Sequence, residues 1–210
     1  MDIKFLAFLL GWWVYHPYSV LISIVLRLKG IHVGKGFYIQ GVPYLKLRAN
    51  PSNIIIGNNV KIYGDIDLRI RENGRIQIQD NVSFDTCCRL VSANNAVLTF
   101  KEYADIGGYC VFNAGTDILI DKHVLIAGYC YIQSSSHGLS RSKTIKSQPH
   151  SYGKVVIGED SWLGSHVTVL PGVDIATGTV IGTKSVVTKS TMTYNIYAGV
   201  PAKKIGERSL

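Results

Sequence analysis

The chain has 210 residues, which is enough for one ordinary domain with a real core and too short for a multidomain machine. Hydrophobic residues make up 47% of the chain and charged residues 17%, which excludes disorder over most of its length. The 22 basic and 14 acidic residues give a net charge of +8, which favours a polyanionic partner. Charge alone leaves nucleic acid, a phosphorylated cofactor and an anionic membrane open.

The first thirty residues are unusually apolar. No residue from Phe5 to Leu26 carries a formal charge, and such a span approaches the ~20 residues needed to cross a bilayer. His16-Pro17 interrupts the run, which predicts two shorter helical segments. A secretory signal is disfavoured because the start of the chain lacks a basic region and no small-residue cleavage site follows.

The second of these segments has the pattern of an amphipathic helix. Its apolar residues recur at i, i+3, i+4 and i+7, namely Leu21, Ile24, Val25 and Leu28. The polar residues Ser19, Ser23 and Arg27 line the opposite side. Three interpretations stay open for this segment. It covers an exposed end or side of the main domain, it lies in a membrane interface with Trp12, Trp13 and Tyr15 as anchors, or it spans the membrane.

A period of six residues governs most of the remaining chain. Every sixth residue from position 157 is aliphatic: Ile157, Leu163, Val169, Ile175, Ile181 and Val187. Six residues hold a short strand and a corner, and three such units close a triangular coil. We expect an all-β chain, a parallel β-helix of three sheets with an aliphatic core. Glycines such as Gly158 and Gly164 follow the inward position, where they are expected to allow the tight backbone of a corner.

Two interruptions divide the repeats. A change of phase after Phe112 predicts a two-residue insertion near residues 113–117. From residue 134 to 153 the pattern gives way to a polar stretch with two histidines and three cations, which predicts a loop extruded from a rigid scaffold. The expected layout is an apolar helical segment over residues 1–30, a β-helix domain over 31–206 that carries the loop 134–153, and a tail over 207–210.

Three segments, IGEDSWLGSHVTVLPGV, IGTKSVVTKS and YAGVPAKKI, resemble the hexapeptide-repeat acyltransferases. The resemblance is to the galactoside, maltose and xenobiotic O-acetyltransferases and to relatives that acetylate cell-envelope polysaccharides. It covers about residues 54–206 and is most specific from Val155 to Ile205. It implies a left-handed parallel β-helix, a homotrimer with active sites between subunits, acetyl-coenzyme A as donor, a hydroxyl acceptor and no nucleic-acid partner.

In the resembled family the catalytic histidine sits early in the extended loop, where His137 of SSSHG stands. An alcohol needs a base to remove its proton, and histidine suits that role near neutral pH. We expect His137 to be this general base, against the alternative of a histidine that only bonds the backbone. His150 closes the loop, where it either touches a substrate or is solvated. Cys110 and Cys130 fall within repeat units and are expected to pack as reduced thiols.

The other histidines suggest no metal site. His123 and His166 occupy outward corner positions and are expected at the surface. The same β-helix also hosts zinc-dependent γ-class carbonic anhydrases, whose histidines must converge across two subunits. The SWLGSHV and GVPAKKI segments match acyltransferases instead, so we expect no bound metal.

The resemblance also places the donor contacts. They fall on Ser165 near the thioester, on Thr183, Thr188 and Lys189 along the coenzyme groove, and on Lys203 near the phosphates. Trp162 either lines the pantetheine channel or packs on an outer sheet face. A further arginine of the family would fall on Gly206, so Lys204 or Arg208 is the candidate substitute.

Acceptor recognition is less determined by the sequence. Asn113 is the candidate to bind an acceptor hydroxyl, or else it caps a corner, and the same two choices hold for Asp117. We expect an acetyl-CoA-dependent O-acetyltransferase for a sugar hydroxyl of a bacterial cell-envelope glycan or its precursor, in the cytoplasm or at the cytoplasmic face of the membrane. The alternatives are an amino-sugar N-acetyltransferase on the same scaffold and a noncatalytic envelope-assembly scaffold.

Overall fold

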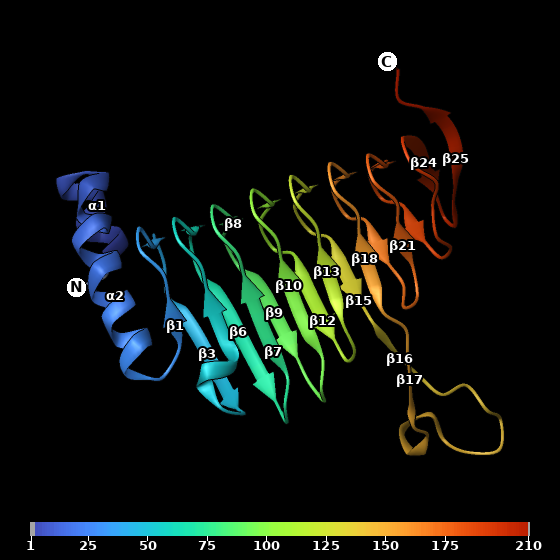
Figure 1. The fold of residues 1–210 in the computed structure, drawn as a ribbon, viewed down its shortest axis with the longest axis horizontal. Helices are drawn as coiled ribbons and strands as arrows, with labels where there is room; N and C mark the ends of the chain where they lie inside the picture. The colour runs from blue at the N-terminus through green and yellow to red at the C-terminus, as the bar shows by residue number, and fades with distance from the viewer. Residues whose placement is uncertain (1–2, 210) are drawn as a thin grey trace.

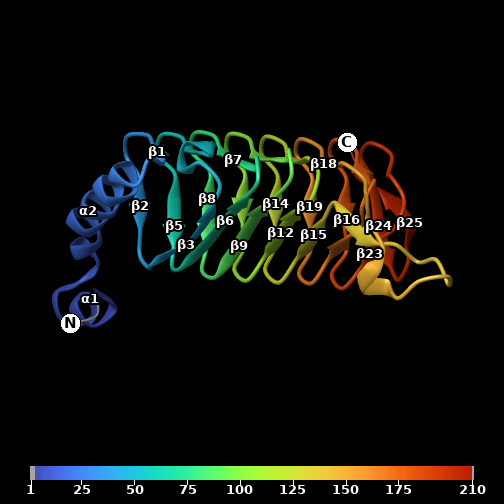
Figure 2. The ribbon, with the colours of Figure 1, turned by 90° about the horizontal axis from the view of Figure 1, so that it is seen from below.

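The computed structural model describes residues 3–209, most of which wind into a parallel β-helix (Figure 1). Three consecutive strands make one coil, and each strand pairs in parallel with the corresponding strand of the next coil. Within the described residues seven coils stack into three sheets that run the length of the molecule (Figure 2). The predicted β-helix of hexapeptide repeats is therefore confirmed.

Each sheet takes one strand from every coil. Sheet A contains β1 (His32–Val33), β4 (Ile54–Ile56), β7 (Arg75–Ile78), β10 (Val97–Phe100), β13 (Ile118–Ile120), β18 (Val155–Ile157) and β21 (Asp174–Ile175). Sheet B contains β2 (Tyr38–Ile39), β5 (Lys61–Tyr63), β8 (Ser83–Asp85), β11 (Asp105–Ile106), β14 (Leu125–Ile126), β19 (Trp162–Leu163), β22 (Val180–Ile181), β24 (Asn195–Gly199) and the antiparallel β25 (Ala202–Glu207). Sheet C contains β3 (Pro43–Arg48), β6 (Ile66–Arg71), β9 (Cys88–Ser92), β12 (Val111–Ala114), β15 (Tyr131–Gln133), β20 (Thr168–Val169) and β23 (Val186–Val187). We name the corners A–B, B–C and C–A after the sheets that they join.

The core consists of columns of inward side chains. Along sheet B the column is Ile39, Ile62, Phe84, Ile106, Ile126, Leu163 and Ile181, each at most 2% exposed. The parallel register sets each of these residues on its counterpart in the next coil, as Ile62 on Phe84. Phe100 meets Phe84 and Phe112 edge to face, with ring centroids 5.0 and 4.9 Å apart. Burial of these columns supplies the main driving force for the fold.

Corner glycines serve close packing between coils. A Cβ atom on Gly158 would lie 2.7 Å from the backbone nitrogen of Thr177, too close for any larger residue. The left-handed conformation falls two residues later, on Asp160 with φ of 57°. The expectation that these glycines supply the tight corner backbone is therefore wrong: their lack of a side chain is what the next coil requires.

Coil length changes along the chain. The register pairs Ile56 with Ile78, Ile78 with Phe100 and Phe100 with Ile120, so these coils are 22, 22 and 20 residues long. Ile157 then pairs with Ile175, 18 residues on. The 20-residue coil confirms the predicted two-residue insertion. The four-residue extensions upstream were not anticipated, and they lengthen the strands of sheet C.

Two helices precede the coils, α1 (Ile3–Leu10) and α2 (Tyr15–Leu28), joined by the short 3-10 helix η1 (Trp12–Val14). The break between them lies at Gly11, whose φ is 93°. The predicted break at His16-Pro17 is wrong because Pro17 stands in the first turn of α2, where a missing N–H removes no helical hydrogen bond. Among residues 3–209, no helix combines the length and the apolar character needed to cross a bilayer.

Helix α2 closes the first coil with a face that carries two serines as well as Leu26. Ser19 and Ser23 are 2% and 6% exposed, whereas the apolar side chains Leu21, Ile24, Val25 and Leu28 point away from the coils. The Ser19 hydroxyl accepts a hydrogen bond from the Ile39 N–H at 2.8 Å and donates to the Tyr15 carbonyl at 2.6 Å. An edge strand needs partners for its backbone, and serine supplies them where leucine cannot. The helix thus covers the end of the domain, but its apolar face takes no part in that contact.

Other side chains of α2 bond to the same open end. The Arg27 guanidinium donates from Nε and Nη2 to the Val33 carbonyl at 3.1 and 2.9 Å, and from Nη2 to the Gly34 carbonyl at 3.0 Å. The Tyr18 hydroxyl donates to the Gly41 carbonyl at 2.9 Å. Backbone groups bonded in this way are not available to another strand.

Replacement of Ser19 tests this polar contact. In Ser19→Ala the buried Ile39 N–H loses its partner, and we expect the free energy of unfolding to fall by about 1–3 kcal/mol. Ser23→Ala is the matched control, since the Ser23 hydroxyl donates only within its own helix, to Val20 at 2.8 Å. Urea denaturation of both variants measures the difference. Equal losses in the two variants would contradict the role given to Ser19.

Candidate active site

The polar stretch over residues 134–153 leaves the coils at the C–A edge as a β-hairpin (Figure 1). Its strands are β16 (Ser135–His137) and β17 (His150–Tyr152), with the 3-10 helix η3 (Ile145–Ser147) between them. Ser134 fixes the base of the hairpin. Its hydroxyl accepts hydrogen bonds from the N–H groups of Gly115 and Thr116 at 3.1 Å each and donates to the Thr116 carbonyl at 2.7 Å.

Two histidines face each other on this hairpin. His137 and His150 are register partners of the antiparallel pair, and their ring centroids lie 4.4 Å apart. The Tyr152 ring follows 6.2 Å from His150. All three side chains are exposed, so a ligand at the hairpin can reach both imidazoles. The sequence gives His137 this place but cannot reveal the pairing, because no periodicity relates residues thirteen positions apart in a loop.

Gln148 organises the rest of the loop. Its Nε2 donates to the carbonyls of Ser140 at 2.9 Å and Lys143 at 3.1 Å, and its Oε1 accepts from the Ser140 N–H at 2.7 Å. The side chain is buried although the segment around it is polar and exposed. One amide therefore satisfies backbone groups across the loop, a role that sequence reasoning missed.

The loop surface is positively charged. Arg141, Lys143 and Lys146 are exposed on it, and the sequence from 134 to 153 contains no acidic residue. Cations around a hairpin that carries two imidazoles favour a negatively charged ligand.

Half of the predicted site residues share the C–A edge with the hairpin. Asn113 lies in β12 opposite Gln133 of β15, and its carbonyl accepts from the Ser134 N–H at 3.2 Å. Thr188 and Lys189 follow β23, which is separated from β15 in sheet C only by β20. Two strand spacings put Thr188 and Lys189 about 10 Å along the coil axis from the base of the hairpin.

The other half lie on sheet B and the B–C edge. Trp162 is 49% exposed and projects from the outer face of sheet B. Ser165 and Thr183 occupy the B–C corners of successive coils. Lys203 lies on β25, opposite Ala198 of β24, at the far end of the same sheet.

One chain therefore carries the predicted residues on two separate sides. His137 stands at the C–A edge, and Trp162 and Lys203 lie on sheet B, which that edge does not border. The sides of a triangular coil are fixed by its core and cannot fold together. The two groups are therefore held apart within one chain.

A ladder of stacked rings runs beside the second group. Tyr109, Tyr129 and His166 stack at the B–C edge with centroids 4.9 Å apart at each step. His123 stacks on Tyr103 at 5.2 Å on the A–B edge. Both histidines are corner residues, as expected, but the ladder itself was missed. The signal is the recurrence of an aromatic residue at the same corner position of successive coils.

Two thiols that the sequence offers as nucleophiles are packed. Cys110 and Cys130 are at most 1% exposed. The hydrogen bond with Cys130 lowers the pKa of Cys110, but the bond with Cys88 and burial raise that pKa further, to about 12. The bond with Cys110, followed by burial, raises the pKa of Cys130. Buried, protonated thiols are inert, which confirms the expectation that they pack.

The two substitutes suggested for a family arginine are engaged within the chain. Lys204 forms an ion pair with Glu207, and its hydrogen bond lowers the pKa of that carboxyl. Arg208 Nη1 lies 2.8 Å from an Asp160 carboxylate oxygen and donates to the Gly178 carbonyl at 3.1 Å. A phosphate contact from either side chain would compete with these bonds, which leaves Lys203 as the better candidate.

Comparisons with known proteins bear on this site. The family described as bacterial transferase hexapeptide (six repeats) matches residues 154–189. WbbJ of Escherichia coli strain K12, named provisionally as a lipopolysaccharide biosynthesis O-acetyl transferase, is 33% identical over 144 residues, which are 65% of this chain and 74% of that protein. A chloramphenicol acetyltransferase of Klebsiella aerogenes is 33% identical over 132 residues, 60% of each chain. This chain thus spans less than two thirds of the second relative.

A solved structure shares the fold. AntD, an N-acyltransferase from Bacillus cereus in complex with dTDP and 3-hydroxybutyryl-CoA, superposes with a TM-score of 0.60 at 22% identity. The superposition covers 89% of this chain and 88% of that one. The β-helix therefore extends over a similar length in both proteins.

Replacement of Gln148 tests how the loop is held. In Gln148→Leu the carbonyls of Ser140 and Lys143 lose a buried donor, so we expect trypsin to cleave at the loop cations about tenfold faster. The thermal midpoint of the coils should stay unchanged because their columns do not contact Gln148. Gln77→Leu, on the outer face of β7, is the control and should cleave like the parent. Unchanged cleavage of Gln148→Leu would contradict the assignment.

Proposed function

Because the chain belongs to the bacterial hexapeptide transferases, we propose that it is an acetyl-CoA-dependent O-acetyltransferase with His137 as general base. The observation that carries this proposal is the position of His137. It stands exposed on a hairpin fixed to a rigid corner, opposite a second imidazole 4.4 Å away. A base held in this way can meet a hydroxyl without reorganisation of the scaffold.

The proposed reaction is a direct transfer. His137 takes the proton of the acceptor hydroxyl while the hydroxyl oxygen attacks the thioester carbonyl carbon. The resulting tetrahedral intermediate collapses with loss of the coenzyme A sulfur, which receives the proton from the imidazolium. The products are the acetyl ester and free coenzyme A. No step needs a protein nucleophile, in agreement with the burial of Cys110 and Cys130.

The donor is proposed to lie between subunits of a homotrimer. Trp162, Ser165 and Thr183 of one subunit would line the pantetheine arm, and Lys203 would meet its phosphates. Asn113, His137, Thr188 and Lys189 would come from the next subunit. Their separation onto different sides of one chain supports this arrangement, since a shared site brings the two groups together.

The proposed acceptor is a sugar hydroxyl of a bacterial envelope glycan or its precursor, with Asn113 at its binding site. Arg141, Lys143 and Lys146 around the hairpin suit an anionic glycan. We place the enzyme at the cytoplasmic face of the membrane, where acetyl-CoA is available, with peripheral contact through α1 and α2. The exposed apolar side chains of these two helices support that contact.

An acceptor panel tests the activity itself. The protein is incubated with acetyl-CoA and free, nucleotide-linked or lipid-linked sugars, with thiol release and product mass as readouts. We expect a product about 42 Da heavier than the acceptor, because an acetyl group replaces one hydrogen atom. Mild base should hydrolyse this product, as it does other esters. A base-stable product would identify an amine acceptor. Thiol release no faster than in protein-free controls, with every acceptor class, would contradict the proposal.

The identity of the base is tested by two histidine variants. His137→Ala should lower acetyl transfer at least about 100-fold while coenzyme binding stays nearly intact. His150→Ala, which removes the facing imidazole, should lower it less than about tenfold, because the proton acceptor remains. Single-turnover rates and coenzyme titration give both quantities. A larger loss in His150→Ala than in His137→Ala would reverse the assignment.

The donor groove is tested by charge reversal. Lys203→Glu should raise the Kd of acetyl-CoA about fivefold at low ionic strength, and the effect should shrink in 0.5 M salt or thereabouts because solvent-exposed charges are screened. Lys46→Glu, on the outer face of β3, is a control of equal charge. Calorimetric titration measures the Kd values. Identical curves for Lys203→Glu and the parent would remove Lys203 from the groove.

A further inference from the structure

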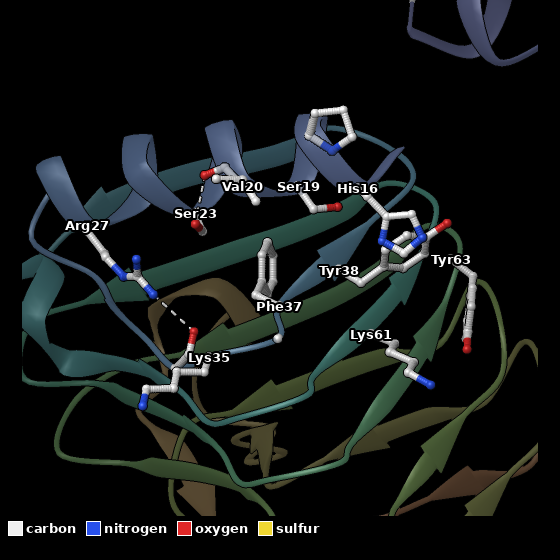
Figure 3. Close-up of a pocket in the computed structure, with 13 residues that line it drawn as sticks. His16, Ser19, Val20, Ser23, Arg27, Lys35, Phe37, Tyr38, Lys61 and Tyr63 are labelled. Carbon is white, nitrogen blue, oxygen red and sulfur yellow. Dashed lines mark hydrogen bonds between the residues drawn. The ribbon is translucent and has the colours of Figure 1, made fainter. Parts of the chain in front are cut away.

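A groove of about 890 Å³ lies beside the contact between α2 and the first coils (Figure 3). The helix forms one wall with His16, Val20 and Arg27. The opposite side comes from the coils, where Phe37 and Tyr38 lie beneath the helix, as Figure 3 shows. This space lies at the N-terminal end of the molecule, several coils away from the catalytic hairpin (Figure 1).

The groove is lined by positive charge. Arg27, Lys35 and Lys61 contribute three permanent cations, and none of the lining residues, all of them described, is acidic. Lys35 and Lys61 are exposed, with their chains at the coil side of the opening. Arg27 is held in place by the Val33 and Gly34 carbonyls. Fixed and mobile cations without a counter-charge favour a phosphate group.

The surface beside the groove is apolar. Exposed large side chains continue from the groove wall over both helices: Phe5, Phe8, Leu9, Leu10, Trp12, Trp13, Val20, Leu21, Ile24, Val25 and Leu28. Phe8 and Leu28 are both 83% exposed. Exposed apolar side chains in this number on two helices mark an interaction site. Its tryptophans, together with the adjacent cations, have the composition of a membrane-interface segment.

The orientation of α2 argues that this surface is used. The face of α2 that meets the coils buries Ser19, Ser23 and Leu26. Leu21 and Leu28, 57% and 83% exposed, face outward although α2 already has apolar residues enough for that contact. Core packing of Leu26 and the hydrogen bonds of Ser19 already fix α2 to the first coil, so the outward apolar face is available to another partner.

We propose that the groove binds the phosphate of an anionic phospholipid while the apolar faces of α1 and α2 enter the bilayer interface. Lys35 and Lys61 would contact the phosphate, and Val20 with its apolar neighbours would contact the acyl chains. This inference rests on the proposed function in one respect, the membrane location of the acceptor. The hairpin leaves sheet C four strands beyond β3, about 20 Å along the coil axis, and the width of α2 adds about 10 Å. It would therefore stand about 30 Å from the bilayer, within reach of a membrane-linked glycan.

Vesicle sedimentation tests the site with the full-length protein. Vesicles of phosphatidylcholine alone are compared with vesicles that also contain phosphatidylglycerol. The parent should bind the anionic vesicles in a salt-sensitive way and the neutral ones much less. Lys35→Glu with Lys61→Glu should lower the partition coefficient on anionic vesicles roughly 30-fold, because the loss of each cation near the surface costs about fivefold. Lys143→Glu with Lys154→Glu, at the far hairpin, carries the same charge change and should bind like the parent.

A second variant tests the apolar face. Leu21→Ser with Leu28→Ser changes only exposed side chains, and it should lose binding without a change in thermal midpoint. Equal binding of the Lys35/Lys61 variant and its control, or equal binding of neutral and anionic vesicles, would overturn the phosphate site. A change in oligomeric mass of the Leu21/Leu28 variant without lipid would overturn it too, because the face would then join two copies. Thiol release by the parent without vesicles, measured separately, shows whether the enzyme proposal stands when lipid binding fails.

Discussion

The structure depends on one packing constraint, an inward side chain at every sixth residue. Because each inward residue rests on its counterpart in the next coil, three columns form and the coil closes as a triangle. Columns of this kind are continuous from Ile39 to Ile181 along sheet B. The corners between the columns are therefore fixed in space, and anything inserted at a corner must project outward. The hairpin that carries His137 is such an insertion, fastened at its base by Ser134.

The same constraint separates the groups that the proposed chemistry needs. His137 leaves from the C–A edge, whereas Trp162 belongs to the outer face of sheet B and Lys203 to the strand that ends that sheet. Rigid sides cannot bend toward each other, so the two groups stay apart within one chain, which supports the proposal of a site shared between subunits. At the opposite end of the β-helix, the N-terminal helices cover the first coil. Ser19 and Arg27 close the first coil, and the outward leucines of α2 are what the coils leave unused.

The β-helix and its core could be predicted from the sequence, because the residues that recur every six positions are those that point inward. Ile157 and its successors are inward as expected, and the phase change after Phe112 is a longer coil. The features that could not be predicted have no periodic signal in the sequence. The pairing of His137 with His150 follows from hairpin register, and the buried amide of Gln148 follows from loop conformation. The face of α2 that meets the coils could not be predicted, because helical periodicity shows that two faces differ without showing which one an open strand edge requires.

Each active site is proposed to be formed by two chains together. The most direct measurement is subunit complementation, in which His137→Ala and Lys203→Glu chains are denatured together and refolded at equal amounts. Acetyl transfer is then measured at low acetyl-CoA concentration, where each of the two variants alone has low activity. A shared site predicts recovery to about one quarter of the wild-type rate, because in a random trimer that fraction of interfaces pairs an intact His137 with an intact Lys203. Activity of the mixture equal to the mean of the two variants would contradict a shared site.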